Sequence, residues 1–157
     1  MRLLANVIGL LVVMVALVTL FNGILGLAGR PFGWSITLQG ILGAIAAPIA
    51  WAIGVPWSEA AAAGSLLGEK LILNEFIAYL DMARMPPEVL SNRSRLIMTY
   101  ALCGFANVAS LGIMIGGLTA MAPGRRDVII ELAPRAMLFG ALATCLSGAI
   151  VGVISGV

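Results

Sequence analysis

Three long apolar runs decide most of what this chain can fold into. Residues 3–21 form a run of 19 in which Asn6 is the only strongly polar side chain, residues 96–122 form a run of 27 without a charge, and residues 136–157 form a run of 22 without a charge. A helix of about 20 apolar residues crosses the hydrocarbon core of a bilayer. Because lipid offers no hydrogen bonds to the backbone, such runs form helices. We therefore expect an all-α membrane protein with about three spanning helices.

The composition excludes most soluble functions. Hydrophobic residues make up 61% of the 157 residues and charged residues only 10%, whereas soluble domains carry about 25% charged residues. A net charge of +2 provides no basic patch for nucleic acid. There is no His, and no nucleophile–base pair or metal cluster can be assembled, so we expect neither an enzyme nor a metal site. Cys103 and Cys145 lie far apart in apolar runs and predict buried free thiols rather than a disulfide.

Residues 1–25 are expected to hold the first spanning helix. Arg2 precedes the apolar run, so a secretory signal peptide is the alternative interpretation. The run is longer than the apolar region of a signal peptide, which is about 7–15 residues, and the small residues that would suit cleavage come late. A spanning helix is therefore the preferred interpretation.

The segment from Ile36 to Gly54 is apolar but interrupted, and it could either span the membrane or lie along the interface as a short helix. The interrupting residues are Gln39, Gly40, Gly43 and Pro48. Tryptophans at the edges of the segment suit the depth of the lipid headgroups, and these are Trp34, Trp51 and Trp57.

Residues 57–80 are expected to form a re-entrant helical hairpin. The stretch from Pro56 to Glu59 is typical of a helix start, with Ser58 as the N-cap. Residues 60–67 and 71–80 are each too short to cross a bilayer, and the stretch 64–70 that leads from one to the other contains Gly64, Ser65, Gly68, Glu69 and Lys70. Short, interrupted apolar segments of this kind point to the binding site of a transporter.

Glu75 is the first side chain that needs an explanation, because it is a carboxylate inside an apolar segment. A carboxylate at the centre of a membrane helix costs about 2.5–3.5 kcal/mol on insertion scales. Lys70 or an arginine could neutralise it, or it could lie at the interface. Lys70 is five residues away, however, and would not face it on a regular helix. We favour a role for Glu75 in binding a ligand or an ion.

Asn107 and Ser110 are polar residues within the longest run. Their i, i+3 spacing places them on one helix face, which Cys103 and Met114 extend. The alternative role is hydrogen bonding between membrane helices, worth about 0.6–2 kcal/mol. Phe105 lies about 200° round a regular helix from Asn107, so the two could meet one ligand only if the helix unwinds near Gly104.

Glycines and arginines elsewhere predict packing and leave the orientation open. Gly112, Gly116 and Gly117 lie one turn further along and predict close helix packing. The loops 81–95 and 123–135 carry three arginines each. Outside the hairpin, four arginines fall on each side of the membrane, so charge alone does not orient the chain. They are Arg2, Arg125, Arg126 and Arg135 on one side, and Arg30, Arg84, Arg93 and Arg95 on the other.

Several stretches together closely resemble the concentrative nucleoside transporter family. The resemblance runs from about Leu3 to the C-terminus. Its members are secondary transporters that move nucleosides with sodium, or with protons in some bacteria, and they are homotrimers built from inverted repeats. The stretches that carry it are Gly54–Glu59 (GVPWSE), Gly64–Lys70 (GSLLGEK), Asn74–Tyr79 (NEFIAY), Ala101–Asn107 (ALCGFAN) and Ala122–Arg126 (APGRR).

The resemblance implies a place and a role for each element. Residues 1–25 correspond to a scaffold helix and residues 26–157 to the C-terminal repeat, with an interfacial helix at 35–54, a hairpin at 57–80 and spans at 96–122 and 136–157. The family topology puts the C-terminus outside and the loop at Arg125 and Arg126 in the cytoplasm. We expect an integral, multi-pass protein of the bacterial inner (plasma) membrane, in contact with the lipid bilayer.

The resemblance also implies a substrate site. Glu75 corresponds to the acid that accepts hydrogen bonds from ribose hydroxyls, Asn107 and Ser110 correspond to further ribose contacts on a discontinuous helix, and Phe105 corresponds to an aromatic residue near the base. A carboxylate, an amide and an aromatic ring suit a nucleoside.

The chain differs from the family in length. The family's first repeat, with a Gly-Gln-Thr-Glu-like hairpin that reads the base and with the sodium ligands, has no counterpart in this sequence. We expect a C-terminal half that is inactive until a missing N-terminal half completes it. The alternatives are a non-transporting membrane remnant or assembly subunit, and a small channel or a carrier of another solute.

Overall fold

The computed structural model describes residues 2–30 and 37–155, and its regular elements in those ranges are all helical. This confirms an all-α membrane protein. Two helical stretches, Val12–Gly29 and Pro123–Ile154, are long and apolar enough to span a membrane, and a bent helix pair makes up to three. The helices are α1 (Arg2–Gly29), α2 (Leu38–Ala52), α3 (Trp57–Ile72), α4 (Glu75–Arg84), α5 (Asn92–Leu102), α6 (Val108–Met121), the short 3₁₀ helix η2 (Pro123–Arg125) and α7 (Arg126–Ile154).

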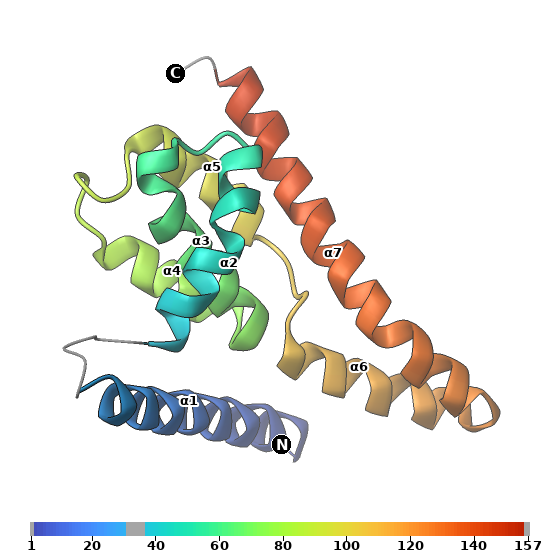
Figure 1. Ribbon diagram of the computed structural model, residues 1–157. Helices are drawn as coiled ribbons and strands as arrows, with labels where there is room; N and C mark the ends of the chain where they lie inside the picture. Colours follow the sequence, from blue (N-terminus) through green and yellow to red (C-terminus); the bar gives the residue numbers. More distant parts are fainter. Residues whose placement is uncertain (1, 31–36, 156–157) are drawn as a thin grey trace.

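Four helices form a central cluster, and α1, α6 and α7 lie around it (Figure 1). α2, α3, α4 and α5 gather in the middle, α7 runs along one side of them, α6 meets α7 at a corner, and α1 lies across the end away from the C-terminus. Asn22 connects α1 to α2, since its Oδ1 accepts from the Leu38 N–H at 2.8 Å and its Nδ2 donates to Gln39 at 2.9 Å.

Small residues let α2 and α3 pack closely although they are bent by 118°. A Cβ atom at Gly64 would lie 2.5 Å from the carbonyl oxygen of Gly43. Gly54 makes the turn between the helices with φ +103°, a conformation that favours glycine. The fully buried side chains Leu66, Leu90, Ile97, Met98 and Leu102 form the core beneath them.

Glycines on α7, rather than those on α6, provide the other close helix contact. A Cβ atom at Gly148 would lie 2.8 Å from the carbonyl oxygen of Ile97, and one at Gly152 would lie 2.9 Å from the Ile97 side chain. Around Gly112, Gly116 and Gly117, no described atom lies within 4 Å of such a position. The described residues therefore do not provide the close contact that the spacing predicts at these three glycines, and that contact stays a prediction.

The run 96–122 is not one continuous helix. It contains the end of α5 and all of α6, separated by non-helical residues 103–107. The helix breaks where α7 approaches: a Cβ atom at Gly104 would lie 2.7 Å from Thr144 Cγ2. Asn107 then starts the new helix as its N-cap. The break satisfies the condition under which Phe105 and Asn107 can face one ligand.

The turn of the hairpin lies later in the sequence than expected. α3 continues through residues 64–70 to Ile72, and the chain turns at Leu73 and Asn74. The glycines in 64–70 serve packing against α2 instead of breaking the helix. The helix also begins differently from the prediction: Pro56 is the N-cap and no side chain caps α3, so Ser58 does not have that role.

The predictions for the loop 123–135 and for Cys103 need correction. α7 begins at Arg126, so most of the expected loop 123–135 is helical; its charged residues precede the apolar part of the helix without ending it. Cys145 is buried but Cys103, at the break, is exposed.

Trp51 and Trp57 stack edge to face with ring centroids 6.3 Å apart. Met1, residues 35 and 36, Trp34 and residues 156–157 lie outside the described ranges.

Candidate functional site

The hairpin turn places Glu75 at the start of a helix. The N–H of Leu73 donates to the carbonyl of Glu69 and closes α3. Asn74 then caps α4, because its Oδ1 accepts from the N–H of Ile77 at 3.0 Å. Glu75 is therefore the first residue of α4, where the positive end of the helix dipole favours a carboxylate.

The broken helix places Asn107 in the same way. Asn107 Oδ1 accepts from the N–H of Ser110 at 2.7 Å and caps α6. The Asn107 side chain is 1% exposed. Since its oxygen is engaged in the cap, the amide nitrogen is the part of this side chain that can serve another partner.

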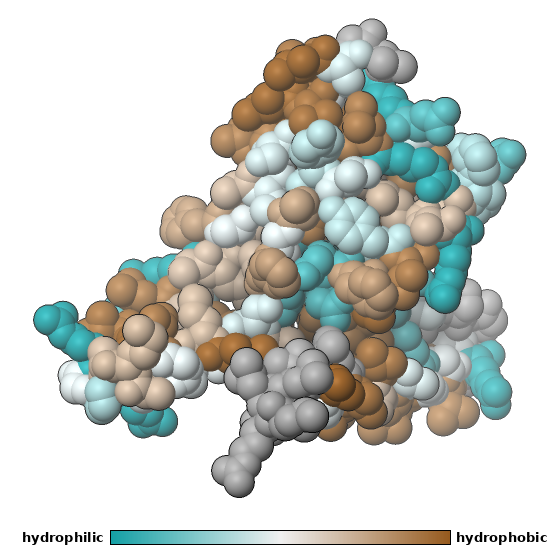
Figure 2. Space-filling view, turned by 180° about the vertical axis from the view of Figure 1, so that it is seen from behind, coloured by the Kyte–Doolittle hydropathy of each residue, from teal (hydrophilic) through white to brown (hydrophobic). Residues whose placement is uncertain are grey.

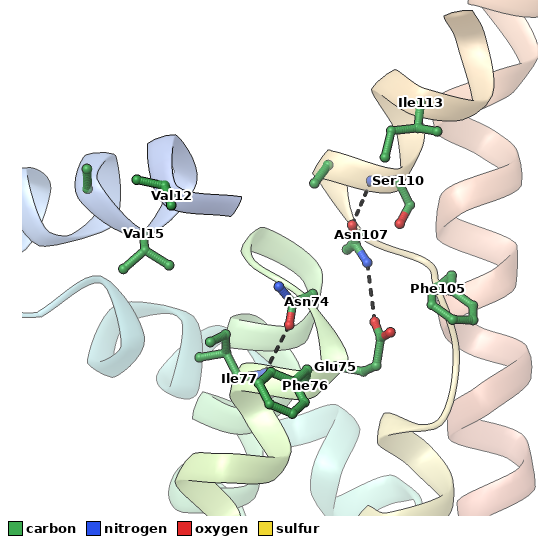
Figure 3. Close-up of a pocket in the computed structure, with 12 residues that line it drawn as sticks. Val12, Val15, Asn74, Glu75, Phe76, Ile77, Phe105, Asn107, Ser110 and Ile113 are labelled. Carbon is green, nitrogen blue, oxygen red and sulfur yellow. Dashed lines mark hydrogen bonds between the residues drawn. The ribbon is translucent and has the colours of Figure 1, made fainter. Parts of the chain in front are cut away.

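Glu75 and Asn107 meet across the two turns. Asn107 Nδ2 donates to Glu75 Oε2 at 3.5 Å, the long end of the hydrogen-bond range. Figure 3 shows the carboxylate of Glu75 pointing toward the Asn107 amide, with Phe105 beside them on the extended segment. The first turns of α4 and α6 are thus joined through a carboxylate and an amide that keep capacity for further hydrogen bonds.

A cavity of about 740 Å³ opens beside this pair. Such a volume is in the range of small-molecule sites, which are mostly apolar with a few polar groups. α1 forms one apolar wall, and α4, α6 and the break form the others. The lining residues are Val12, Val15, Ala16, Asn74, Glu75, Phe76, Ile77, Phe105, Asn107, Ala109, Ser110 and Ile113.

Phe105 and Ser110 border this cavity and a neighbouring one. The neighbouring cavity has a volume of about 330 Å³ and lies between α6 and α7, where it also touches Asn107, Met114 and Gly140. Phe105 lies on the non-helical segment between α5 and α6 and is 78% exposed. A large aromatic ring that is not covered by this chain is available to pack against another molecule.

All four residues expected at the site lie around the first cavity: Glu75, Phe105, Asn107 and Ser110. Met114, expected on the same stripe, borders the second cavity. Cys103 does not share that stripe, because the break separates it from α6. Lys70 does not border the cavity and does not hydrogen-bond to Glu75; its Nζ donates to the carbonyl of Ala101 and to Thr144 Oγ1.

Sequence reasoning missed the apolar wall from α1 and the capping roles. The sequence gives no local signal that distinguishes Val12, Val15 and Ala16 from ordinary lipid-facing residues. The caps carried a signal, however. Asn74 and Asn107 are the residue type favoured at N-caps, and each precedes an apolar helix. In the described ranges, no group of three or more His, Cys, Asp or Glu is placed to hold a metal ion.

Comparison with known proteins gives a consistent result. The family model described as "Na+ dependent nucleoside transporter C-terminus" matches residues 1–152. The Bacillus subtilis protein "Uncharacterized transporter YutK" is 47% identical over 148 residues, which is 94% of this chain and 36% of that protein. The Helicobacter pylori "Nucleoside permease NupC" is 42% identical over 108 residues, which is 66% of this chain and 26% of that protein.

A solved structure has the same fold over almost the whole chain. CNTnw in an inward-facing, substrate-bound state matches with a TM-score of 0.90 and 43% identity, covering 99% of this chain and 39% of CNTnw. The chain thus spans well under half of the length of these relatives. The match begins at residue 1, so the first apolar run is part of the shared domain.

The family is one of transporters rather than of enzymes, and the chain is an integral, multi-pass membrane protein with apolar helices exposed on its surface. The apolar run patterns, the paired helix breaks and these matches lead to one conclusion: the chain belongs to the sodium-dependent nucleoside transporter family and carries that family's C-terminal domain.

Proposed function

We propose that this chain supplies the ribose-side contacts of a sodium-coupled nucleoside carrier. The observation that carries the proposal is the Glu75–Asn107 pair at the wall of a 740 Å³ apolar cavity. The carboxylate of Glu75 accepts hydrogen bonds from two neighbouring ribose hydroxyls. Hydrogen bonds to a charged group are about twice as strong as neutral ones, so this contact dominates recognition of the sugar.

Asn107 and Ser110 complete the polar side of the site. Because Asn107 Oδ1 caps α6, only Nδ2 faces the ligand, and it donates to a ribose oxygen. The hydroxyl of Ser110 both donates and accepts. Phe105 covers the flat face or edge of the base, which explains why so large a ring is left exposed by this chain.

The proposal includes a partner segment and an ion. Inverted-repeat transporters bind their substrate where two repeats meet, and this chain provides one of them. An N-terminal half lies against the exposed faces of α6 and α7 and brings the residues that read the base and hold the ion. Sodium is the coupling ion that the name of the matched family model indicates, with a proton as the alternative. The complete protein is a homotrimer in the bacterial inner membrane.

The surface supports a partner. Large apolar side chains are exposed along α6 and α7, including Met121 at 84% and Val153 at 82%. Figure 2 shows brown, apolar side chains in several patches on one face of the molecule, with paler and teal side chains between them. Lipid accounts for part of this surface, but Ile113 and Phe105 border the cavity, where a second protein wall would enclose a ligand.

The test is uptake by a joined protein. The matching segment of CNTnw, 39% of its length, is replaced by this chain, and the protein is reconstituted in liposomes. We expect uptake of labelled uridine that rises with an inward sodium gradient and falls with Glu75→Gln. A joined protein that inserts but transports no nucleoside with either a sodium or a proton gradient would contradict the proposal and favour the assembly-subunit alternative.

A further inference from the structure

Lys70 is the most deeply buried charged side chain in the described ranges, and the substrate site does not use it. It lies in the last turn of α3 and is 1% exposed. A lysine is almost never buried so completely unless its ammonium group has partners. Two partners are present: Nζ donates to the carbonyl of Ala101 at 2.9 Å and to Thr144 Oγ1 at 2.6 Å. The Thr144 hydroxyl donates its own proton to the carbonyl of Ala141 at 2.8 Å, so its lone pairs are available to Lys70.

The first of these partners belongs to the broken end of α5. The last carbonyls of a helix have no N–H partner within it, and in a membrane they must be satisfied by protein. Three successive carbonyls at this end each have a different donor. The Tyr79 hydroxyl donates to Thr99 O at 2.5 Å, the Cys103 N–H donates to Tyr100 O at 3.2 Å, and Lys70 donates to Ala101 O.

The hairpin therefore holds both sides of the break. Lys70 from α3 and Tyr79 from α4 bind the end of α5, while Glu75 from the turn binds Asn107 at the start of α6. The segment between these attachments carries Phe105. Its position relative to Glu75 is thus set by contacts that the hairpin makes on either side of it.

Charge makes the Lys70 contact different from the other two. The carbonyl end of a helix carries a partial negative charge, which a cation stabilises. In secondary transporters, such half-helix ends often coordinate the coupling ion. Here a side-chain ammonium occupies that place.

We propose that Lys70 is a positioning residue for the nucleoside site, whose ammonium acts as a fixed cation at the carbonyl end of the broken helix. The effect of Lys70 on nucleoside binding rests on the proposed function. The contact between Lys70 and the end of α5 does not depend on any substrate. It follows that this break keeps its geometry without a bound ion.

The test uses a cysteine that the chain already has. Cys103 is exposed at the first residue of the break, and Cys145 on α7 is buried. In the full chain reconstituted in liposomes, the rate of maleimide labelling at Cys103 reports the order of the break, with Cys145 as the internal reference. Lys70→Met should speed the labelling of Cys103 about tenfold, since the end of α5 loses a hydrogen bond from a charged donor. Cys145 should stay slow to label, because it is buried within the continuous helix α7. Lys70→Arg should restore most of the parent rate, because it keeps a charged donor.

The matched control removes a positive charge elsewhere. Arg84 is exposed on α4 and pairs only with Asp81 among the described residues, so Arg84→Met should change neither rate. In the joined transporter, Lys70→Met should also weaken uridine binding about tenfold, with recovery in Lys70→Arg. Labelling of Cys103 and uridine binding that both stay within about twofold of the parent would overturn the proposal. Equal acceleration of maleimide labelling at Cys103 and Cys145 would also overturn the proposal, because it would mean general unfolding.

Two milder variants keep the test decisive if Lys70→Met does not accumulate in the membrane. Thr144→Val removes one partner of Lys70, and Tyr79→Phe removes the donor to Thr99 O. Each should speed Cys103 labelling about threefold, in keeping with the loss of one hydrogen bond. A labelling rate in Thr144→Val equal to that of the parent would overturn the proposal. If labelling responds as expected but the parent joined protein binds no uridine, the proposed function fails while the role of Lys70 at the helix end stands.

Discussion

Asn107 joins two helix starts with its two amide atoms. Its Oδ1 accepts from the N–H of Ser110 at 2.7 Å and caps α6, and its Nδ2 donates to Glu75 Oε2 at 3.5 Å, at the start of α4. One side chain thus sets the local backbone and orients the carboxylate that we propose binds ribose. The predictions below separate these two roles and test the neighbouring packing.

Glu75→Gln should lower uridine uptake by the joined protein at least about tenfold at sub-saturating uridine. The loss of hydrogen bonds to a charged acceptor costs about 1.5–3 kcal/mol, and about 1.4 kcal/mol is tenfold. Glu88→Gln is the matched control, because Glu88 is an exposed acid in the loop after α4. Uptake by Glu75→Gln equal to that of the control, at equal amounts in the membrane, would rule out the ribose contact.

Asn107→Ala should weaken the binding of ribonucleosides more than the binding of analogues without the ribose hydroxyls. The analogues lack the hydroxyls that Asn107 contacts, so the substitution removes fewer of their hydrogen bonds. The measurement is the ratio of affinities for uridine and 2′,3′-dideoxyuridine. Asn107→Ser separates the two roles of this residue, since serine can cap α6 but lacks the Nδ2 donor. It should change the ratio as alanine does while the protein remains closer to parental stability. If the serine variant keeps the parental ratio, the alanine effect comes from the lost cap.

Phe105→Ala should weaken the binding of all nucleosides to a similar extent. Contacts of an aromatic ring with the face or edge of a base tolerate changes of base identity. Competition by uridine, cytidine, adenosine and guanosine measures this. Phe139→Ala is the control, because Phe139 is similarly exposed at 66% on α7 but does not border either cavity beside Glu75 and Asn107. A change confined to one base would contradict a general stacking role.

Gly148→Val should destabilise the chain, whereas Gly116→Val should not. The side chain at 148 would enter the contact between α7 and the carbonyl of Ile97, and overpacking of this kind costs about 1–3 kcal/mol. At Gly116, an added side chain meets open space within the described part of the chain. Thermal unfolding of the full chain in detergent compares the two variants. Equal transition temperatures would show that the α5–α7 contact is looser than described.

The chain alone should insert in a membrane but show no sodium-stimulated uridine uptake. A site at the meeting of two inverted repeats needs both of them, and the cavity walls from this chain leave Phe105 exposed. Liposomes with an inward sodium gradient and labelled uridine provide the measurement, with empty liposomes as the control. Concentrative uptake by the chain alone would mean that copies of this repeat build a complete pathway.

The sequence by itself determined the class of protein and predicted four residues that the structure brings to one cavity. Uncharged runs such as 136–157 require helices in lipid, because the bilayer leaves the backbone no other partner. Glu75, Asn107 and Ser110 stood out because polar groups are costly at that depth. Phe105 was a candidate only if the helix unwound near Gly104, and the resemblance added its role near the base. All four line one cavity, although their expected roles stay predictions.

Only the tertiary structure decided where the helices break and which glycines make contacts. Gly64 and Gly104 are the same residue type in similarly apolar surroundings, yet the helix continues through Gly64 and stops before Gly104. The difference lies in the neighbour: α2 packs on the helix at Gly64, whereas Thr144 of α7 occupies the space at Gly104. Likewise, Lys70 binds Ala101 and Thr144 rather than its sequence neighbour Glu75. These contacts join residues that are 31 and 74 positions apart in the sequence. Local sequence patterns do not indicate which residues so far apart come into contact.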